Sequence, residues 1–137
     1  MSSFTDFAEE AILNHLFKGV SWTPPAALYL ALFTADPGES STPTDECTYL
    51  GYERAEVPSW GDVEAAASGE GKQIANAVAV LCPGNAGADD VVVTHAGLFD
   101  AMTGGELLLK GALGAPKTLR TDDGLAFQPG QLVFSVD

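Results

Sequence analysis

The spacing of apolar residues changes once along the chain, near a pair of prolines. Between residues 3 and 17 apolar residues recur every three or four positions, which is the spacing of one face of an α-helix. This stripe comprises Phe4, Phe7, Ala8, Ala11, Ile12 and Leu16. Ser3 is a suitable N-cap and Gly19 a suitable left-handed C-cap, and Pro24 and Pro25 prevent continuation. The pattern predicts one N-terminal helix.

Beyond Pro25 the apolar residues alternate with polar ones or form short runs, as they do in β-strands. Strands are predicted at residues 27–34, 49–57, 73–81, 91–99, 106–113, 117–121, 125–127 and 131–136. Asp122-Asp123-Gly124 predicts a tight hairpin turn, and residues 59–72 a loop with at most a short edge strand. We therefore expect an all-β fold, a single antiparallel β-sandwich or barrel-like domain of about seven or eight short strands preceded by one α-helix.

Length and composition favour one folded domain. The chain has 137 residues, of which 46% are hydrophobic, so it is not an acidic disordered tail. We expect a single domain over residues 1–137, with the helix in 1–19 and the β domain in 26–137. The longest apolar run, residues 26–33, is far shorter than the roughly 20 residues of a membrane helix, and the N-terminus lacks the pattern of a signal peptide.

The charge is strongly acidic and unevenly distributed. There are 19 Asp and Glu residues against 6 Lys and Arg, which gives a net charge of -13. This balance argues against nucleic acid and anionic membranes as partners. Between Asp36 and Glu70 there are nine acids and one base, Arg54. We expect this stretch to form one acidic face directed at solvent or at a basic partner.

Candidates for catalysis are few and scattered. His15 and His95 are the two histidines, and no nucleophile motif accompanies either. We expect His15 to have a packing or capping role, and His95, five residues before Asp100, to belong to a strand. Glu53 and Glu56 flank Arg54, which is typical of a solvated strand face with an ion pair. The sequence predicts no catalytic residue and no enzyme, with a small hydrolase using His95 as a minor alternative.

The sequence also predicts no metal and no cofactor. Cys47 and Cys82 are far apart and outside any CxxC motif, so we expect two free structural thiols. No His/Cys cluster has zinc spacing, no acidic cluster has the order of a calcium loop, and no Gly-rich segment opens a helix as a phosphate loop does. The candidate acids for calcium are Asp36, Glu39, Asp45, Glu46, Asp89, Asp90, Asp122 and Asp123.

Several sequence segments, in a fixed order over nearly the whole chain, carry a resemblance to known proteins. They are SSFTDFAEEAILNHLFKG, PPAALYLALFTADPG, GYERAEV, QIANAVAV, VVVTHAGLFDAMTGGELLLKGAL and KTLRTDDGLAFQPGQLVFSVD. Taken in this order, they make the chain resemble a family of small virion proteins of tailed bacteriophages, usually labelled tail-fibre or minor tail proteins. The resemblance implies a structural protein of the virion, assembled in the host cytoplasm, that acts through protein–protein contacts.

One group of residues matches the family pattern in the segment of closest resemblance. The group comprises His95, Gly97, Phe99, Asp100, Gly104 and Gly105. We interpret it as structural: Gly97 allows a close approach, Phe99 anchors the core, and Asp100 caps the turn that ends at the two glycines. Glu53 and the acidic Asp122-Asp123-Gly124 turn depart from the family pattern at the surface.

The resemblance leads to a first hypothesis and two alternatives. The first is a tail or tail-fibre protein, present as a homo-oligomer or in many copies and bound to other virion proteins. The alternatives are a capsid decoration protein, and a host-surface or carbohydrate-binding module in which Trp22, Trp60 and Tyr52 stack on sugars. The apolar stripe of the helix must be covered by its own sheet or by a neighbouring subunit. The candidate assembly residues are Phe4, Phe7, Ile12, Trp22 and Trp60.

Overall fold

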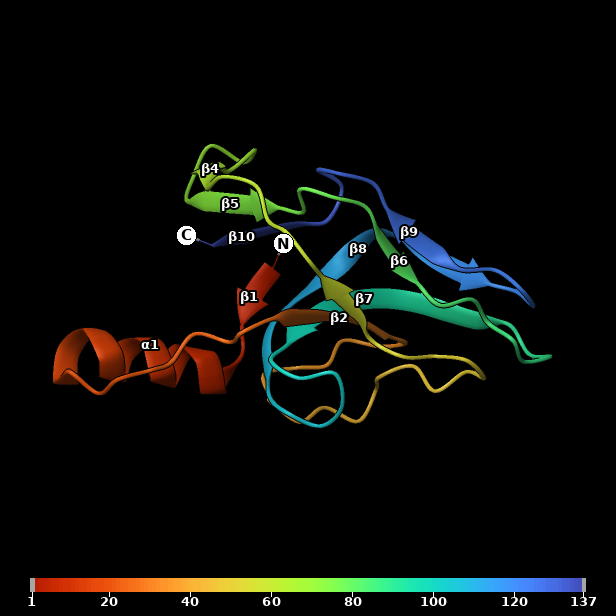
Figure 1. The fold of residues 1–137 in the computed structure, drawn as a ribbon, viewed down its shortest axis with the longest axis horizontal. Helices are drawn as coiled ribbons and strands as arrows, with labels where there is room; N and C mark the ends of the chain where they lie inside the picture. Colours follow the sequence, from red (N-terminus) through yellow and green to blue (C-terminus); the bar gives the residue numbers. More distant parts are fainter. Residues whose placement is uncertain (1, 137) are drawn as a thin grey trace.

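The computed structural model describes residues 2–136 as a β body from which one helix projects (Figure 1). The elements in chain order are β1 (Ser2–Phe4), α1 (Asp6–Lys18), β2 (Leu28–Phe33), β3 (Ala55–Val57), β4 (Glu64–Ala65), β5 (Lys72–Ala75), β6 (Val80–Cys82), β7 (Val91–Phe99), β8 (Leu107–Leu119), β9 (Leu125–Phe127) and β10 (Val133–Val136). The described part of the chain therefore has ten strands, more than the eight predicted: one predicted strand is divided, two are joined into β8, and the short strands β1 and β4 are added.

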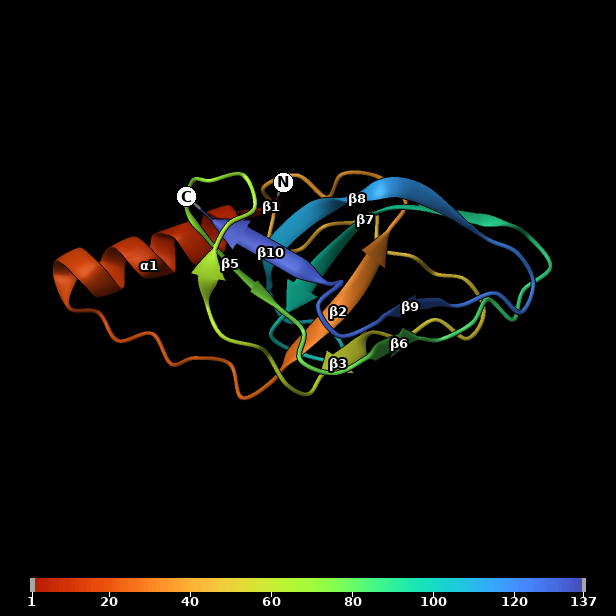
Figure 2. The same cartoon turned by 90° about the horizontal axis from the view of Figure 1, so that it is seen from above.

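The strands form three antiparallel sheets. The largest has the order β1-β8-β7-β2-β3, and the smaller sheets have the orders β10-β5-β4 and β6-β9. Leu98 of β7 is opposite Leu30 of β2 and Leu109 of β8, which fixes the register of the central strands. Both smaller sheets lie over the same face of the large one (Figures 1 and 2). The predicted class, an antiparallel β fold with one N-terminal helix, is confirmed, and within residues 2–136 the sheets form no closed barrel.

The core lies on both faces of the large sheet. The main cluster, between the sheets, includes Leu30, Leu32, Val93, Leu98 and Phe134. A second cluster on the opposite face consists of Ala31, Phe33, Phe99 and Leu107. Residues 30–33 of β2 are all buried, as its predicted two-sided apolar pattern requires. Both faces of β2 are apolar, so both must be covered. The loops that follow β2 and β7 cover the second face.

A buried asparagine explains why the predicted strand 73–81 is wrong as one element. Asn76 is 2% exposed, and its Nδ2 donates to the carbonyl oxygens of Val78, Phe127 and Gln128. Its Oδ1 accepts the backbone N–H of Leu132 at 2.9 Å. A buried amide must satisfy its donors and acceptor, and this one does so by bending the chain between β5 and β6. The two halves consequently join different sheets.

The end of the chain differs from the prediction in its pairing. The predicted strands 106–113 and 117–121 are one strand, β8, in which Pro116 falls where the register with β7 is broken between Val93 and His95. A proline is tolerated at such an irregularity because no ladder hydrogen bond is needed there. Asp122 adopts φ 70°, so the turn forms, but β8 pairs with β7 while β9 pairs with β6. The predicted hairpin is therefore wrong.

The predicted strand 49–57 is also shorter than expected. Residues 49–52 form a turn, in which the N–H of Tyr52 donates to the carbonyl of Tyr49, and only β3 remains extended and paired. The short edge strand within residues 59–72 is present as β4.

Helix α1 begins later than predicted. Ser3 is not the N-cap, because β1 extends through it and pairs with β8 at Lys110. Thr5 takes the N-cap position, yet its hydroxyl donates to the Leu107 carbonyl at 2.6 Å instead of capping the helix. The predicted end at Gly19 is confirmed, with φ 65°. Helix α1 has 13 residues, and no helix among the described residues is long and apolar enough to cross a membrane.

Gly97 permits the closest contact between the central strands, which gives a first prediction. A Cβ at this position would lie 2.7 Å from Leu107 Cδ1 and 2.8 Å from the Leu109 carbonyl oxygen. Gly97→Ala should therefore lower the free energy of unfolding by about 1–3 kcal/mol through overpacking, measured by urea denaturation followed by circular dichroism. Gly114→Ala is the matched control, because a Cβ there meets nothing within 4 Å. Equal stabilities of the two variants would refute the close approach.

Candidate functional site

The first candidate surface is the segment that leaves the β body. We call residues 6–27 the arm: α1 extends outward, and residues 19–27 return to β2 (Figures 1 and 2). Of the helix residues, only Ala8 is buried. The exposed fractions are 56% for Leu13, 69% for Leu16 and 81% for Phe17. The arm thus presents large apolar side chains to solvent.

The apolar stripe predicted for the helix is divided among different surroundings. Phe4 belongs to β1, Ala8 faces the body, Ile12 is half-buried, and Phe7 and Leu16 are exposed. At about 100° per residue, Leu13 and Phe17 fall on the side turned away from Ala8, whereas Leu16 lies only about 80° from it. The prediction missed Leu13 and Phe17 because it assumed one core-facing stripe. Their signal in the sequence is the presence of apolar residues around the whole outer part of the helix.

The base of the arm is fixed to the body by backbone and side-chain hydrogen bonds. The N–H of Thr5 donates to the Leu108 carbonyl at 2.9 Å, and the N–H of Asp6 donates to the Glu39 carbonyl at 3.1 Å. At the outer end, a contact within the arm holds the chain after the helix: His15 Nδ1 lies 3.2 Å from the Val20 carbonyl oxygen. The arm therefore has a defined direction.

The second candidate surface is an apolar cleft of about 250 Å³ between the large sheet and the three-stranded sheet. Its lining residues are Phe4, Leu28, Trp60, Ile74, Leu98, Leu109, Phe134 and Val136. The Trp60 ring packs edge-to-face on Phe134, with centroids 6.2 Å apart. Trp60, predicted to be an assembly residue, and Phe4 are thus brought together here, where the main core opens to the surface.

Carboxylates lie beside the apolar cleft. An adjoining hollow shares Phe4 and Val136 with it and is also lined by Glu9 and Glu70. Elsewhere the predicted acidic face is partly neutralised within the chain, since Lys110 Nζ lies 2.8 Å from Asp36 Oδ1 and 3.7 Å from Glu39 Oε1. The Lys110 ammonium also holds the pKa of Asp36 below its usual value.

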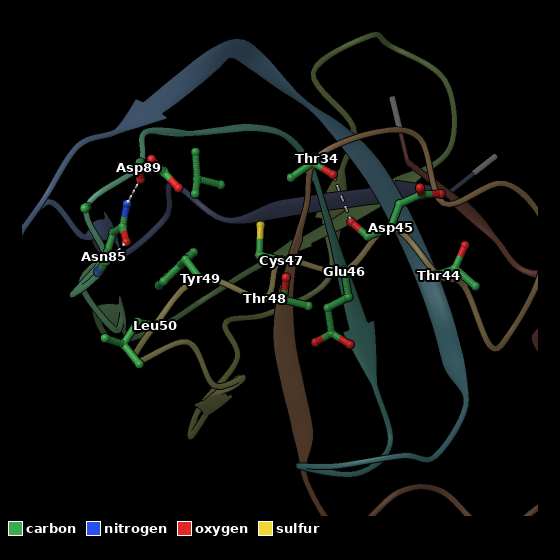
Figure 3. Close-up of a pocket in the computed structure, with 13 residues that line it drawn as sticks. Thr34, Thr44, Asp45, Glu46, Cys47, Thr48, Tyr49, Leu50, Asn85 and Asp89 are labelled. Atoms are coloured by element: carbon green, nitrogen blue, oxygen red, sulfur yellow. Dashed lines mark hydrogen bonds between the residues drawn. The ribbon is translucent and has the colours of Figure 1, made fainter.

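The third candidate surface is a polar pocket of about 530 Å³ near the start of β7 (Figure 3). It is lined by Thr34, Thr44, Asp45, Glu46, Cys47, Thr48, Tyr49, Leu50, Asn85, Gly87, Ala88, Asp89 and Val91. Much of this polarity is used within the fold. Asn85 Nδ2 donates to the carbonyls of Asp89 and Leu119 at 2.8 and 3.0 Å, and Thr34 Oγ1 donates to the Asp45 carbonyl.

The aromatic residues proposed to bind sugar do not converge on this pocket. Tyr52 donates its hydroxyl to Glu46 Oε2 at 2.6 Å, and burial raises its pKa. Trp60 lines the apolar cleft, and Trp22 is half-buried in the returning part of the arm. The structure therefore places the three rings in three different surroundings.

A buried ion pair joins the loops on the second face of the large sheet. Arg54 is 8% exposed, and its Nη2 and Nε donate to the two carboxylate oxygens of Glu46, both at 2.8 Å. Its Nη1 donates to the carbonyls of Ala101 and Gly104, and the guanidinium lies 3.4 Å above the Phe99 ring. The prediction of a solvated ion pair among Glu53, Arg54 and Glu56 is wrong, because the partner comes from a distant loop.

The residues that match the family pattern lie in β7 and in the loop that follows it, next to this ion pair. Asp100 Oδ1 accepts the N–H of Glu106 at 2.8 Å, and Gly105, at φ 69°, packs directly against Asp100. Phe99 is buried beneath Arg54. His95 Nδ1 lies 2.8 Å from its neighbour Thr94 Oγ1. This arrangement orders the loop between β7 and β8.

The thiols are free and buried. Cys47 and Cys82 are both buried and unpaired with each other, which confirms the predicted free thiols. Desolvation raises the pKa of Cys47 to about 11 and that of Cys82 to about 12. Within residues 2–136, no group of three or more His, Cys, Asp or Glu side chains is placed to hold a metal ion.

Comparison with known proteins gives one family for nearly the whole chain. The family model described as podophage GP4 fiber I protein gp80 matches residues 3–135. No curated protein matches the sequence significantly. The matched range includes both the arm and the β body, so the family unit comprises the two together.

The buried guanidinium leads to a second prediction. Arg54→Ala leaves the Glu46 carboxylate without its ion-pair partner, and breaking such a buried pair costs about 3 kcal/mol of unfolding free energy. Arg120→Ala is the control, since Arg120 is 77% exposed and lies 4.0 Å from Asp90; its effect should stay within about 0.5 kcal/mol. Urea denaturation measures both. A loss for Arg54→Ala no larger than the control would contradict the proposed importance of the pair.

The raised thiol pKa values lead to a third prediction. At pH 8, below both values, the thiols are protonated and buried, so a thiol-reactive reagent should label neither cysteine in the folded protein. In denaturing urea it should label both. Mass spectrometry of intact protein gives the number of labels, and rapid labelling without urea would show that the two side chains are accessible.

Proposed function

The chain belongs to the family of podophage GP4 fiber I protein gp80 and is a structural fibre protein of the virion; from this premise we propose that its arm is the element that attaches it to other virion proteins. A fibre component must bind its neighbours tightly enough to survive outside the cell. It therefore needs an apolar surface that is covered only after assembly.

The exposed apolar side chains of the arm are the observation that carries this proposal. Burying apolar surface contributes roughly 25 cal/mol per Å². A partner that covers Leu13, Leu16 and Phe17 would therefore be bound with a favourable free energy. A neighbouring subunit and the chain's own sheet were the two expected covers, and α1 buries only Ala8 against its own body. This favours a neighbouring subunit. Phe7, 37% exposed, is a further apolar residue of the helix, nearer to the body.

Attachment of the arm base to the sheet supports one domain over residues 1–137. The Thr5 hydroxyl and β1 tie the start of the arm to β8. A partner that grips the arm is thereby coupled to the β body through hydrogen bonds and strand pairing. Such coupling suits a protein that transmits load along a fibre and has no catalytic step to perform. We further propose that the chain acts in several copies, as closed assemblies of virion proteins do.

Incorporation into particles gives the fourth prediction. The double variant Leu16→Asp, Phe17→Asp removes the apolar tip and should incorporate into virions at least tenfold less, with unchanged far-UV circular dichroism and melting temperature. The matched control is Leu50→Asp, Leu81→Asp, because these leucines are 67% and 70% exposed on the body. Quantitative mass spectrometry of purified particles measures tagged copies of each. Normal incorporation of the arm variant, or equal loss by the control, would refute the role of the arm.

A further inference from the structure

We propose that the arm of one copy inserts its tip into the apolar cleft of a second copy of the same chain. The inference rests on the proposed function and adds the identity of the partner and of the receiving surface. Four observations carry it: the open apolar cleft, the direction of the arm, the spacing of its side chains and the distribution of charge.

The cleft is a place where the core is incomplete. Its walls are apolar side chains from the five-stranded and the three-stranded sheets, and Val136 at its edge is 37% exposed. An apolar cleft that opens to water gains most from an apolar occupant. A helix that offers two or three neighbouring apolar side chains is one established kind of occupant for such a groove.

The chain's own arm does not reach this cleft. Phe4 lines the cleft and α1 starts at Asp6, so the base of the arm stands at its rim. The helix has 13 residues and is about 20 Å long at roughly 1.5 Å per residue. Because it points away from the body (Figures 1 and 2), its tip ends far from the cleft. A second copy is needed to bring a tip there.

The tip has the side chains that a groove requires. Leu13, Leu16 and Phe17 stand at positions i, i+3 and i+4, which places them side by side on the helix surface. Phe17 is the most exposed of the three. We assign Phe17 as the side chain that enters the cleft and the two leucines as those that pack along its edge.

The charge distribution favours the same chain as the partner. The sequence contains no acid between Glu10 and Asp36, although the net charge is -13, and the tip carries Lys18. The cleft has acidic surroundings: Glu9 and Glu70 line the adjoining hollow. Lys72 of β5, opposite Val136 in the sheet that forms one wall of the cleft, is the one basic residue among these charges and is outnumbered by the two carboxylates. The outer end of the helix, with Lys18 and no acid, is therefore complementary in charge to the Glu9 and Glu70 carboxylates beside the cleft of a second copy.

This contact is heterologous, since donor and receiving surfaces differ. Every copy then uses both surfaces, and repetition gives a ring when the rotation closes and a filament when it does not. Both outcomes are assemblies suited to a fibre. The β body retains its own buried core in either case, so the exchange adds contacts without requiring the body to unfold.

Disulfide trapping tests the contact directly. Phe17→Cys and Ile74→Cys proteins, purified separately and mixed under a mild oxidant, should form a disulfide-linked heterodimer whose tryptic peptides join positions 17 and 74. The matched control mixes Phe17→Cys with Leu50→Cys, because Leu50 lines the polar pocket together with Val91, at the opposite end of β7 from Leu98 of the cleft. The native cysteines are buried and serve as internal negative controls.

The alternatives give distinct results. Preferential linkage of position 17 to position 17 would show pairing of arm tips and overturn the inference. Absence of the 17–74 link, together with loss of virion incorporation by Leu16→Asp, Phe17→Asp, would show that the arm binds a different virion protein, so the inference would fail while the proposed function stands. Absence of the link with normal incorporation would refute both.

A charge reversal tests the electrostatic part separately. Lys18→Glu should weaken self-association several-fold in sedimentation experiments at low salt, and the difference should shrink at high salt because screening reduces the added repulsion. Lys117→Glu, at an exposed position of β8, is the matched control and should change self-association little. Equal effects of the two substitutions would contradict a specific contact of Lys18 with an acidic rim.

Discussion

The contact between Arg54 and Glu46 is the interaction on which the geometry of the rest depends. It fixes Glu46, at the end of the loop after β2, and the same guanidinium binds the carbonyls of the loop after β7. These loops cover Phe33 and Phe99 on the second face of the large sheet. A sheet with two apolar faces needs two layers of cover, and here one of them is made of loops. Loops alone lack a packed core, so a buried, fully bonded guanidinium supplies the order.

The direction of the arm follows from the same cover. The loop that carries Glu46 also provides the Ser41 carbonyl for the N–H of Leu107 and the Glu39 carbonyl for the N–H of Asp6. Leu107 in turn accepts the Thr5 hydroxyl. A chain of contacts thus connects the ion pair to the first turn of the helix. In a protein that works by assembly, this connection matters because it determines where the apolar tip is presented.

The sequence predicts those parts of the fold that are determined by neighbouring residues. Strand β7, the buried strand β2 and the end of α1 at Gly19 follow from local apolar spacing and from the conformational freedom of glycine. The failures share a cause, which is a partner distant in the sequence. Asn76 interrupts a predicted strand because it bonds to residues 127 and 128, and Arg54 is buried because Glu46 reaches it from another loop.

The candidate site shows the same limit in another form. Apolar spacing indicates that a helix will bury a face, but it carries no information about which molecule covers that face. The sequence predicts Phe4, Phe7, Ile12, Trp22 and Trp60 as assembly residues. It does not point to Leu13 and Phe17, whose exposure follows from the projection of the helix away from the body. The acid-free stretch between Glu10 and Asp36 is readable in the sequence from the start. Its meaning depends on the fold, because the projection of α1 carries this stretch away from the acidic loops of its own body. The net charge of -13 favours repulsion between two such chains, and the proposed contact uses a stretch of the arm that adds no acid to that repulsion.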